Sequence, residues 1–222
     1  MRKHRCLLIL LVLVCTALRV AAGPSDIAIL ATMDTAIADG AWSGTNQGNQ
    51  PRLAVGHQGI EPEASRALIR FDLTQIRSDA QITRATLQLF CTGSSGDSDT
   101  FVTAYRITQD WTEMTATWNG MADSYAEAYD TTQISWRCGE RPRYSYWDIS
   151  ELVQDWIDGT QPNYGVMLIG YEGIGDNLRQ FNSREEPYGN EPWLLISWGV
   201  PIPPAIKRVY LPSVFKGTYK AE

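Results

Sequence analysis

Residues 65–73 read Ser65-Arg66-Ala67-Leu68-Ile69-Arg70-Phe71-Asp72-Leu73, a segment that alternates between apolar and charged side chains. Ala67, Ile69, Phe71 and Leu73 occupy every second position, while Arg66, Arg70 and Asp72 fall between them. A period of two is the pattern of a β-strand with one buried and one exposed face. The same period recurs at 85–91 and 101–107, and clusters of Gly, Asn, Asp and Pro separate these segments. We therefore expect a series of short antiparallel strands.

One segment, residues 149–158, follows the helical period instead. Asp148 precedes it at the N-cap position, Glu151 follows three residues later, and Gly159 stands where the helix would end. With the strand pattern and the long loops at 39–51 and 119–143, this predicts an all-β fold: a two-sheet antiparallel jelly-roll β-sandwich with one short helix. Four tryptophans are expected in its core, Trp147, Trp156, Trp193 and Trp198.

The two ends of the chain differ from its middle. Residues 1–22 combine a basic start, an apolar run and small residues before Gly23, which is the pattern of a secretory signal peptide. Residues 23–200 form the predicted domain, and residues 201–222 form a Pro-rich basic tail that suits either docking on another protein or folding back onto the domain. The apolar runs are too short for a transmembrane segment. We expect a secreted protein, extracellular or at the cell surface.

The predicted domain is acidic. Residues 23–200 hold 11 Arg, no Lys and 24 Asp or Glu, a balance of −13. Such a surface repels phosphate backbones, so we expect no nucleic-acid partner.

Two cysteines, Cys91 and Cys138, lie within the domain. In an oxidising compartment they favour one disulfide, and the alternative is a pair of buried free thiols on different strands. Together with the single domain histidine, His57, they are too few for a zinc site.

Four further sequence blocks follow the 65–73 strand in a fixed order. They are Ala80 to Leu89, Trp111-Thr112-Glu113-Met114-Thr115-Ala116-Thr117-Trp118-Asn119-Gly120, Asn163-Tyr164-Gly165-Val166 and Phe181-Asn182-Ser183-Arg184-Glu185. In this order they resemble the DNRLRE domain, a family named from disaggregatase-related proteins that overlaps a carbohydrate-binding module family. The resemblance covers about residues 34–198 and departs from the family at Asp148-Ile149-Ser150 and in an acidic insertion after Asn119. It implies a non-catalytic module that contacts extracellular polysaccharide.

Two segments, residues 136–146 and 179–188, carry side chains of the kinds that bind sugars. Sugar sites combine an aromatic platform, which meets apolar C–H faces, with planar hydrogen-bonding groups. Arginine also meets the carboxylate of an acidic sugar with two parallel bonds. The competing interpretation pairs Arg184 internally with Glu185. The candidate carbohydrate-binding residues are Trp136, Arg141, Arg143, Tyr144, Arg179, Arg184 and Tyr188.

Catalytic patterns are sparse in this sequence. It lacks a Gly-x-Ser-x-Gly elbow, and His57 falls in a Gly-rich turn where an exposed loop residue is expected. Glu113 stands between two tryptophans in a block that we interpret as structural. We therefore predict no enzyme and no cofactor. Asp97 and Asp99 carry oxygens of the kind that calcium binds, although two carboxylates in such a turn more often form a solvated hairpin. Structural calcium therefore stays open, with no ligands assigned.

Two alternative functions remain at this point. One is a structural or adhesive protein of the cell surface or matrix. The other is a polysaccharide-degrading lyase or glycosidase, suggested by the disaggregatase link, because a glycosidase needs only two suitably placed carboxylates.

Overall fold

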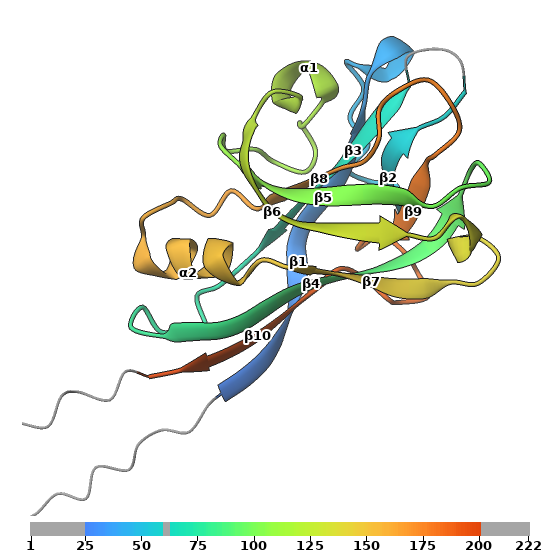
Figure 1. Ribbon diagram of the computed structural model, residues 1–222. Coiled ribbons are helices and arrows are strands. Elements are labelled where there is room, and N and C mark those ends of the chain that lie inside the picture. The colour runs from blue at the N-terminus through green and yellow to red at the C-terminus, as the bar shows by residue number, and fades with distance from the viewer. Residues whose placement is uncertain (1–24, 60–62, 201–222) are drawn as a thin grey trace, which may run out of the picture.

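The computed structural model describes residues 25–59 and 63–200, whose regular secondary structure consists mostly of strands (Figure 1). The predicted signal peptide and the predicted tail lie outside these residues. The expected all-β class is confirmed. The strands are β1 (Ser25–Ala38), β2 (Arg52–His57), β3 (Ala64–Phe71), β4 (Gln81–Ser94), β5 (Thr100–Ile107), β6 (Tyr125–Ile134), β7 (Arg143–Asp148), β8 (Val166–Ile169), β9 (Arg179–Asn182) and β10 (Trp193–Gly199). The helices are α1 (Trp118–Met121), α2 (Ser150–Asp158) and the single 3₁₀ turns η1 (Gly40–Trp42) and η2 (Trp136–Cys138).

The long strand β1 belongs to two sheets. Its first part, Ser25–Leu30, pairs with β10, and its second part, from Ala31, pairs with β3, with a register irregularity between Ala31 and Met33. Strand β2 likewise pairs with β9 and with β3. These antiparallel pairings close a ring in the order β1-β10-β4-β9-β2-β3, while β7 adds to β4 and β8, β5 and β6 extend from β3.

The closed ring differs from the expected sandwich. A jelly roll packs two sheets face to face, whereas here β1 and β2 pass from one sheet to the other and join them in a barrel-like arrangement. A register irregularity lets a strand bend, and the one between Ala31 and Met33 directly follows the change of partner between Leu30 and Ala31. The jelly-roll topology stays a prediction.

Strand β3 is covered on both faces at its centre. Ala67, Ile69 and Phe71 point into the main core and are at most 1% exposed, as the alternating pattern predicted. Leu68, on the opposite face, is also fully buried, because Trp111 packs over it in a second apolar cluster. The 111–120 block is therefore an outer cover for β3, which agrees with its interpretation as structural.

The expected core tryptophans divide into two groups. Trp147 and Trp156 are buried, and the indole Nε1 of Trp147 donates to the Val102 carbonyl at 2.8 Å. Trp193 is only half-buried, which corrects the prediction for this residue, while Trp198, also half-buried, packs against the main core. On β10 the buried Leu194 and Ile196 face the core, and Trp193 alternates with them on the outer face of the sheet.

Helix α2 ends as the sequence predicted and begins slightly differently. Gly159 has a φ of +71°, the left-handed conformation that commonly ends a helix. Ile149, and not Asp148, is the N-cap residue. Asp148, one position before it, still accepts a hydrogen bond from the Ser150 N–H at 3.0 Å. The single turn α1 was not predicted, because four residues are too few to show a helical period. None of the helices in 25–59 and 63–200 is long and apolar enough to cross a membrane.

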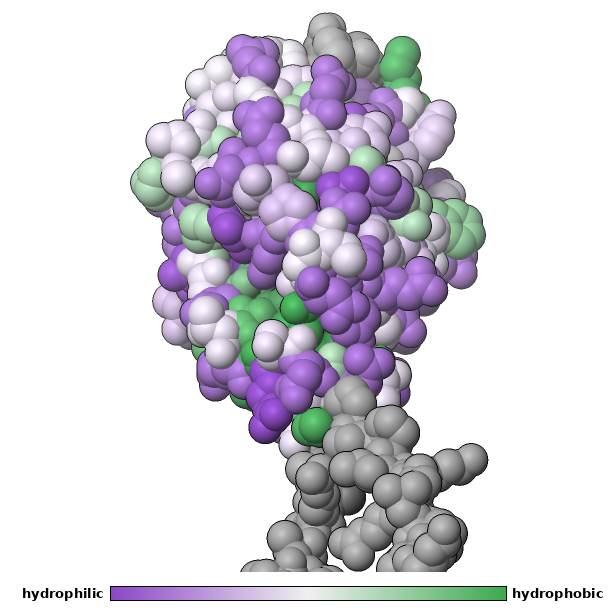
Figure 2. Space-filling view, turned by 90° about the vertical axis from the view of Figure 1, so that its left-hand side faces the viewer, coloured by the Kyte–Doolittle hydropathy of each residue, from purple (hydrophilic) through white to green (hydrophobic). Residues whose placement is uncertain are grey.

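Figure 2 shows the α2 side of the molecule, where apolar side chains gather in a hollow between polar ones. A groove of about 600 Å³ lies between α2 and the end of β3, with Trp156, Ile157, Leu73 and Ile76 among its lining residues. The packing of α2 on the ring thus leaves part of the edge of the core open to the surface.

The predicted disulfide is present between Cys91 of β4 and Cys138 of η2. Their Cα atoms are 5.7 Å apart, and the two residues are separated by 47 positions in the sequence. The alternative of two free thiols is thereby excluded. The bond ties the loop after β6 to the middle of the sheet.

We predict that replacing both cysteines by serine lowers the free energy of unfolding by about 2–4 kcal/mol, because the unfolded chain regains the freedom that the closed loop removed. Denaturant unfolding measures this loss. Reductant should lower the stability of the natural protein and leave the double variant unchanged. Identical unfolding midpoints for the two proteins would contradict the prediction.

Candidate functional site

Residues 136–146 carry a group of aromatic and cationic side chains that we call the η2–β7 surface. They are Trp136, Arg137, Arg141, Arg143, Tyr144 and Tyr146. The first part of this surface is fixed to neighbouring strands by hydrogen bonds. The Trp136 N–H donates to the Asp99 carboxylate at 3.0 Å, and the Ser94 hydroxyl donates to the Trp136 carbonyl at 2.5 Å. The Arg137 guanidinium lies 4.5 Å from the centre of the Trp136 ring. The Trp136 indole is half-buried, its backbone is fixed by these hydrogen bonds, and the Arg137 guanidinium lies over its ring.

The second part of this surface is a row of aromatic rings on β7 and β4. Tyr144 and Tyr146 alternate with the buried Ser145 and Trp147, so they project from the outer face of the sheet. The ring centres of Tyr144 and Phe90 are 4.8 Å apart, and those of Tyr144 and Tyr146 are 6.4 Å apart. Tyr146 is half exposed. Flat apolar rings in a row provide a platform for sugar faces.

A groove of about 350 Å³ runs beside these rings. Its lining includes Arg143, Tyr144 and Tyr146 together with Asp99, Gln133 and Ser135 from the neighbouring loop and strand. Carboxamide, hydroxyl and guanidinium groups therefore meet an aromatic surface here. This is the combination of groups that sugar recognition requires.

Most arginines of the domain form ion pairs or hydrogen bonds within the fold, away from this surface. Within residues 25–59 and 63–200, six of the eleven form ion pairs: Arg52 with Glu186, Arg66 with Glu172, Arg70 with Asp110, Arg77 with Asp79, Arg106 with Glu127 and Arg184 with Glu113. Arg179 is buried. The arginines left over in this part of the chain are Arg84, Arg137, Arg141 and Arg143, and the last three are exposed neighbours on the η2–β7 surface. An acidic domain thus presents a local group of free cations, with Glu140 as the anion between them.

The other predicted site residues on exposed segments are Arg141 and Tyr188. Arg141 lies in the turn between η2 and β7, and its N–H donates to the Arg137 carbonyl at 2.8 Å. Tyr188 is 90% exposed. It stands two residues before Asn190, whose side chain accepts from the Tyr144 hydroxyl at 2.6 Å. The turn that carries Tyr188 is therefore connected to the aromatic row.

Arg179 does not belong to a surface site, which corrects the sequence prediction. Its side chain is fully buried, and its guanidinium donates to the carbonyls of Ser95, Leu178 and Ser98 at 3.0, 2.9 and 2.6 Å. Burial lowers the pKa of Arg179. The signal was present in the sequence, because Arg179 and the core residue Phe181 share one face of β9 by the period of two. A guanidinium enclosed in this way cannot contact an external polysaccharide.

Arg184 is placed away from the η2–β7 surface as well. Its guanidinium donates to Glu113 Oε1 at 2.7 Å, so its ion-pair partner is Glu113 and not the neighbouring Glu185. Its backbone N–H donates to Asp34 Oδ2 at 3.0 Å. Arg184 thus joins the segment after β9 to β1 and to the 111–120 block.

Asp34, Glu113 and Glu185 bring their carboxylates together beside Arg184. One oxygen of each lies within 4.8 Å of the others. Burial raises the pKa of Asp34 to about 8; the hydrogen bond from the Arg184 N–H opposes the rise, and the charges of Glu185 and Glu113 add to it. Glu113 Oε1 also accepts the Asp34 N–H at 2.9 Å. No local sequence pattern indicates this group, because its members lie on three distant segments.

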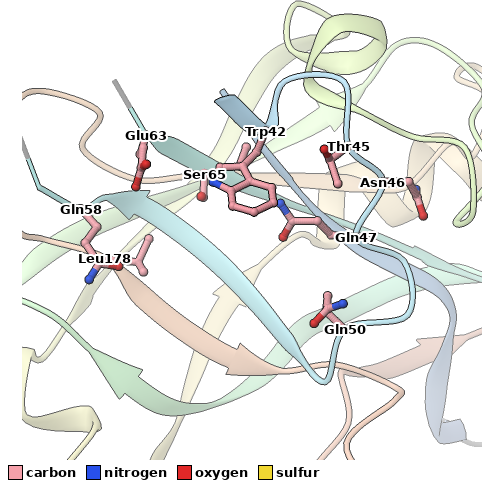
Figure 3. A pocket seen from close by; sticks show the side chains of 10 residues that line it. Trp42, Thr45, Asn46, Gln47, Gln50, Gln58, Glu63, Ser65 and Leu178 are labelled. Carbon is pink, nitrogen blue, oxygen red and sulfur yellow. The ribbon is translucent and has the colours of Figure 1, made fainter. Parts of the chain in front are cut away.

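A second pocket, of about 420 Å³, surrounds Trp42 in η1 (Figure 3). The indole is 52% exposed and lies beside Gln47, with Gln50, Gln58 and Glu63 around the opening. Carboxamides and one aromatic face are again sugar-binding chemistry, here without arginine in the lining. The position of Trp42 in a long loop was the sequence signal, although this residue was not among the predicted site residues.

The remaining candidates serve structural roles. His57 is 2% exposed, and its Nδ1 lies 3.0 Å from the Gly175 carbonyl, so the expected exposed loop residue is in fact buried at the end of β2. Asp99 fixes the Trp136 N–H, and Asp97 accepts from the Ser98 hydroxyl at 3.0 Å. These contacts agree with the hairpin interpretation of the Asp97–Asp99 turn.

We predict that Arg179→Lys lowers the free energy of unfolding by about 2–4 kcal/mol, because a lysine cannot reach the three carbonyls that the planar guanidinium satisfies. Arg84→Lys, at an exposed position, is the matched control and should leave stability unchanged. Chemical denaturation compares the two variants. An Arg179→Lys protein of natural stability would show that the buried contacts do not stabilise the fold.

Comparison with known families gives a match across the described domain. The model for carbohydrate-binding module family 96 matches residues 26–198, from the first strand to the last. A search of curated proteins found no match. The family finding agrees with the predicted carbohydrate-binding module, and the narrower DNRLRE name stays a prediction.

Proposed function

The chain belongs to carbohydrate-binding module family 96, and from this we propose that it is an exported protein that binds acidic extracellular polysaccharide without cleaving it. The η2–β7 surface is the proposed contact. The observation that carries the proposal is the exposure of Arg137, Arg141 and Arg143 on one short segment, none of them in an ion pair among the described residues. Arg143 lines the same groove as the half-exposed Tyr146.

The chemistry of this surface fits a chain of uronic acid units. A guanidinium binds a carboxylate with two parallel hydrogen bonds, and Arg143 lies in the same groove as the tyrosines that would support the sugar ring. The rest of the domain is acidic and repels a polyanion. Binding of an acidic glycan is therefore favoured at the unpaired arginines of the η2–β7 surface. This restricts an acidic glycan to one part of the surface.

Two further features support a binding role outside the cell. The Cys91–Cys138 disulfide is typical of proteins in oxidising compartments. Glu113, the carboxylate between the tryptophans, has its Oε1 engaged by Arg184 and by the Asp34 N–H. A carboxylate held in this way supports the fold and is poorly placed to exchange protons with a substrate.

The Trp42 pocket is a second candidate contact, suited to neutral sugar units. Its lining offers carboxamides and an indole face but no arginine. A glycan without carboxylates would therefore prefer it, because nothing there compensates the desolvation of an anion.

We predict that Arg143→Ala loses about 10–100-fold in affinity for alginate or pectin, since a charge-assisted hydrogen bond contributes about 1.5–3 kcal/mol. Affinity electrophoresis in gels containing each polysaccharide measures this loss. Arg84→Ala removes an exposed arginine outside the surface and should retain affinity. Equal losses in both proteins would show that overall charge, and not this surface, determines binding.

We also predict that Trp42→Ala leaves binding to acidic glycans unchanged and weakens binding to neutral glucans, by about 10-fold for the loss of one stacking platform. The same gels test it. New reducing ends or unsaturated sugars would instead indicate a degrading enzyme. Unaltered migration in every acidic and neutral gel would favour the structural or adhesive role.

A further inference from the structure

The three carboxylates beside Arg184 come from parts of the chain that are far apart in sequence. Asp34 lies in β1, Glu113 lies in the segment between β5 and α1, and Glu185 follows β9. Their closest oxygens all lie within 4.8 Å of one another. Like charges at this separation repel unless a proton or a cation neutralises part of them.

Two oxygens of this group are buried without a hydrogen-bond partner. Asp34 is 0% exposed, and its Oδ1 has no partner, while its Oδ2 accepts the Arg184 N–H. Glu185 Oε2 is also buried and unpartnered. A buried, unpaired carboxylate oxygen is costly, and such an oxygen in a natural fold commonly marks a ligand or ion.

The charge balance of the site is negative. Arg184 is the cation in the group, and it already pairs with Glu113 Oε1. Three carboxylates and one guanidinium leave two negative charges if all are ionised. A divalent cation held by these carboxylates would neutralise that excess.

We propose that Asp34, Glu113 and Glu185 bind a hard divalent cation, calcium in preference to magnesium. Oxygens up to 4.8 Å apart fit around one calcium ion, whose bonds to oxygen are about 2.4 Å long. Magnesium bonds of about 2.1 Å do not reach the upper end of that range. Water or backbone carbonyls complete the coordination, and Arg184 positions Glu113.

The cation would act on the fold by joining β1, the 111–120 block and the segment after β9. It would also act on the neighbouring loop. The Asn46 side chain donates to the Glu113 carbonyl at 2.8 Å, and the Ser183 hydroxyl donates to the Gln50 carbonyl at 2.7 Å. Asn46 and Gln50 belong to the loop that lines the Trp42 pocket. Calcium would therefore hold this pocket in shape, whichever glycan the protein binds.

The test is thermal unfolding and titration calorimetry of purified, chelator-treated full-length protein, with calcium chloride or magnesium chloride added and no glycan present. We expect calcium to raise the melting temperature by about 5–10 °C at 100 times its dissociation constant. Magnesium should produce a smaller shift. Absence of both a calcium-induced shift and calorimetric binding would overturn the proposal. A proton shared among the three carboxylates would then compensate their charges.

Asp34→Asn tests the ligand assignment. The amide oxygen can still accept the Arg184 N–H, but one negative charge is lost, so the calcium-induced shift should disappear. Glu185→Gln is the second variant in case Asp34→Asn does not fold, and it should lose the shift in the same way. Asp97→Asn, in the acidic turn before β5, is the matched control and should keep it. Retention of the shift in Glu185→Gln would overturn the assignment. Since no sugar is present, these results are independent of the proposed glycan contact.

Discussion

Strand β1 changes its partner half-way along its length, and the closed ring depends on that change. Its first part hydrogen-bonds to β10 and its second part to β3, across a register irregularity. Because β1 and β2 both cross between the sheets, the side chains of β3 that point inward are enclosed on every side. The second half of β1 also carries Asp34 into the interior. The ring and the carboxylate group therefore arise from one strand.

The distribution of arginines explains how an acidic domain can offer a cationic surface. Most arginines satisfy carboxylates of the fold, as Arg66 does with Glu172 and Arg184 with Glu113. Arg179 satisfies backbone carbonyls instead. These internal roles leave the short run around η2 as the main place where guanidinium groups face water. Its backbone is fixed by the disulfide and by Asp99, which limits the entropy lost on binding.

Local patterns predicted the parts of the fold that depend on local periodicity. The alternation around Ala67 gave the correct inward face of β3, and Gly159 ends α2 as expected. The burial of Arg179 could also have been read from its position on the same face as Phe181. Local patterns could not predict contacts between distant parts of the chain. His57 contacts a carbonyl 118 positions away, and Asp34 contacts Glu113 across 79 positions. For the same reason the paired arginines could not be separated from the free ones before the structure was known.

The two ends of the domain leave it side by side, because Ser25 pairs with Trp198 at the edge of the ring. Strand β4 begins next to them, where Gln81 pairs with Gly199, and reaches Arg143 at Cys91. Ten residues of extended chain span about 33 Å. Ser25 and Gly199 therefore lie at the end of β4 opposite to η2, so a tether joined at either of these residues would leave the arginines of the η2–β7 surface facing outward.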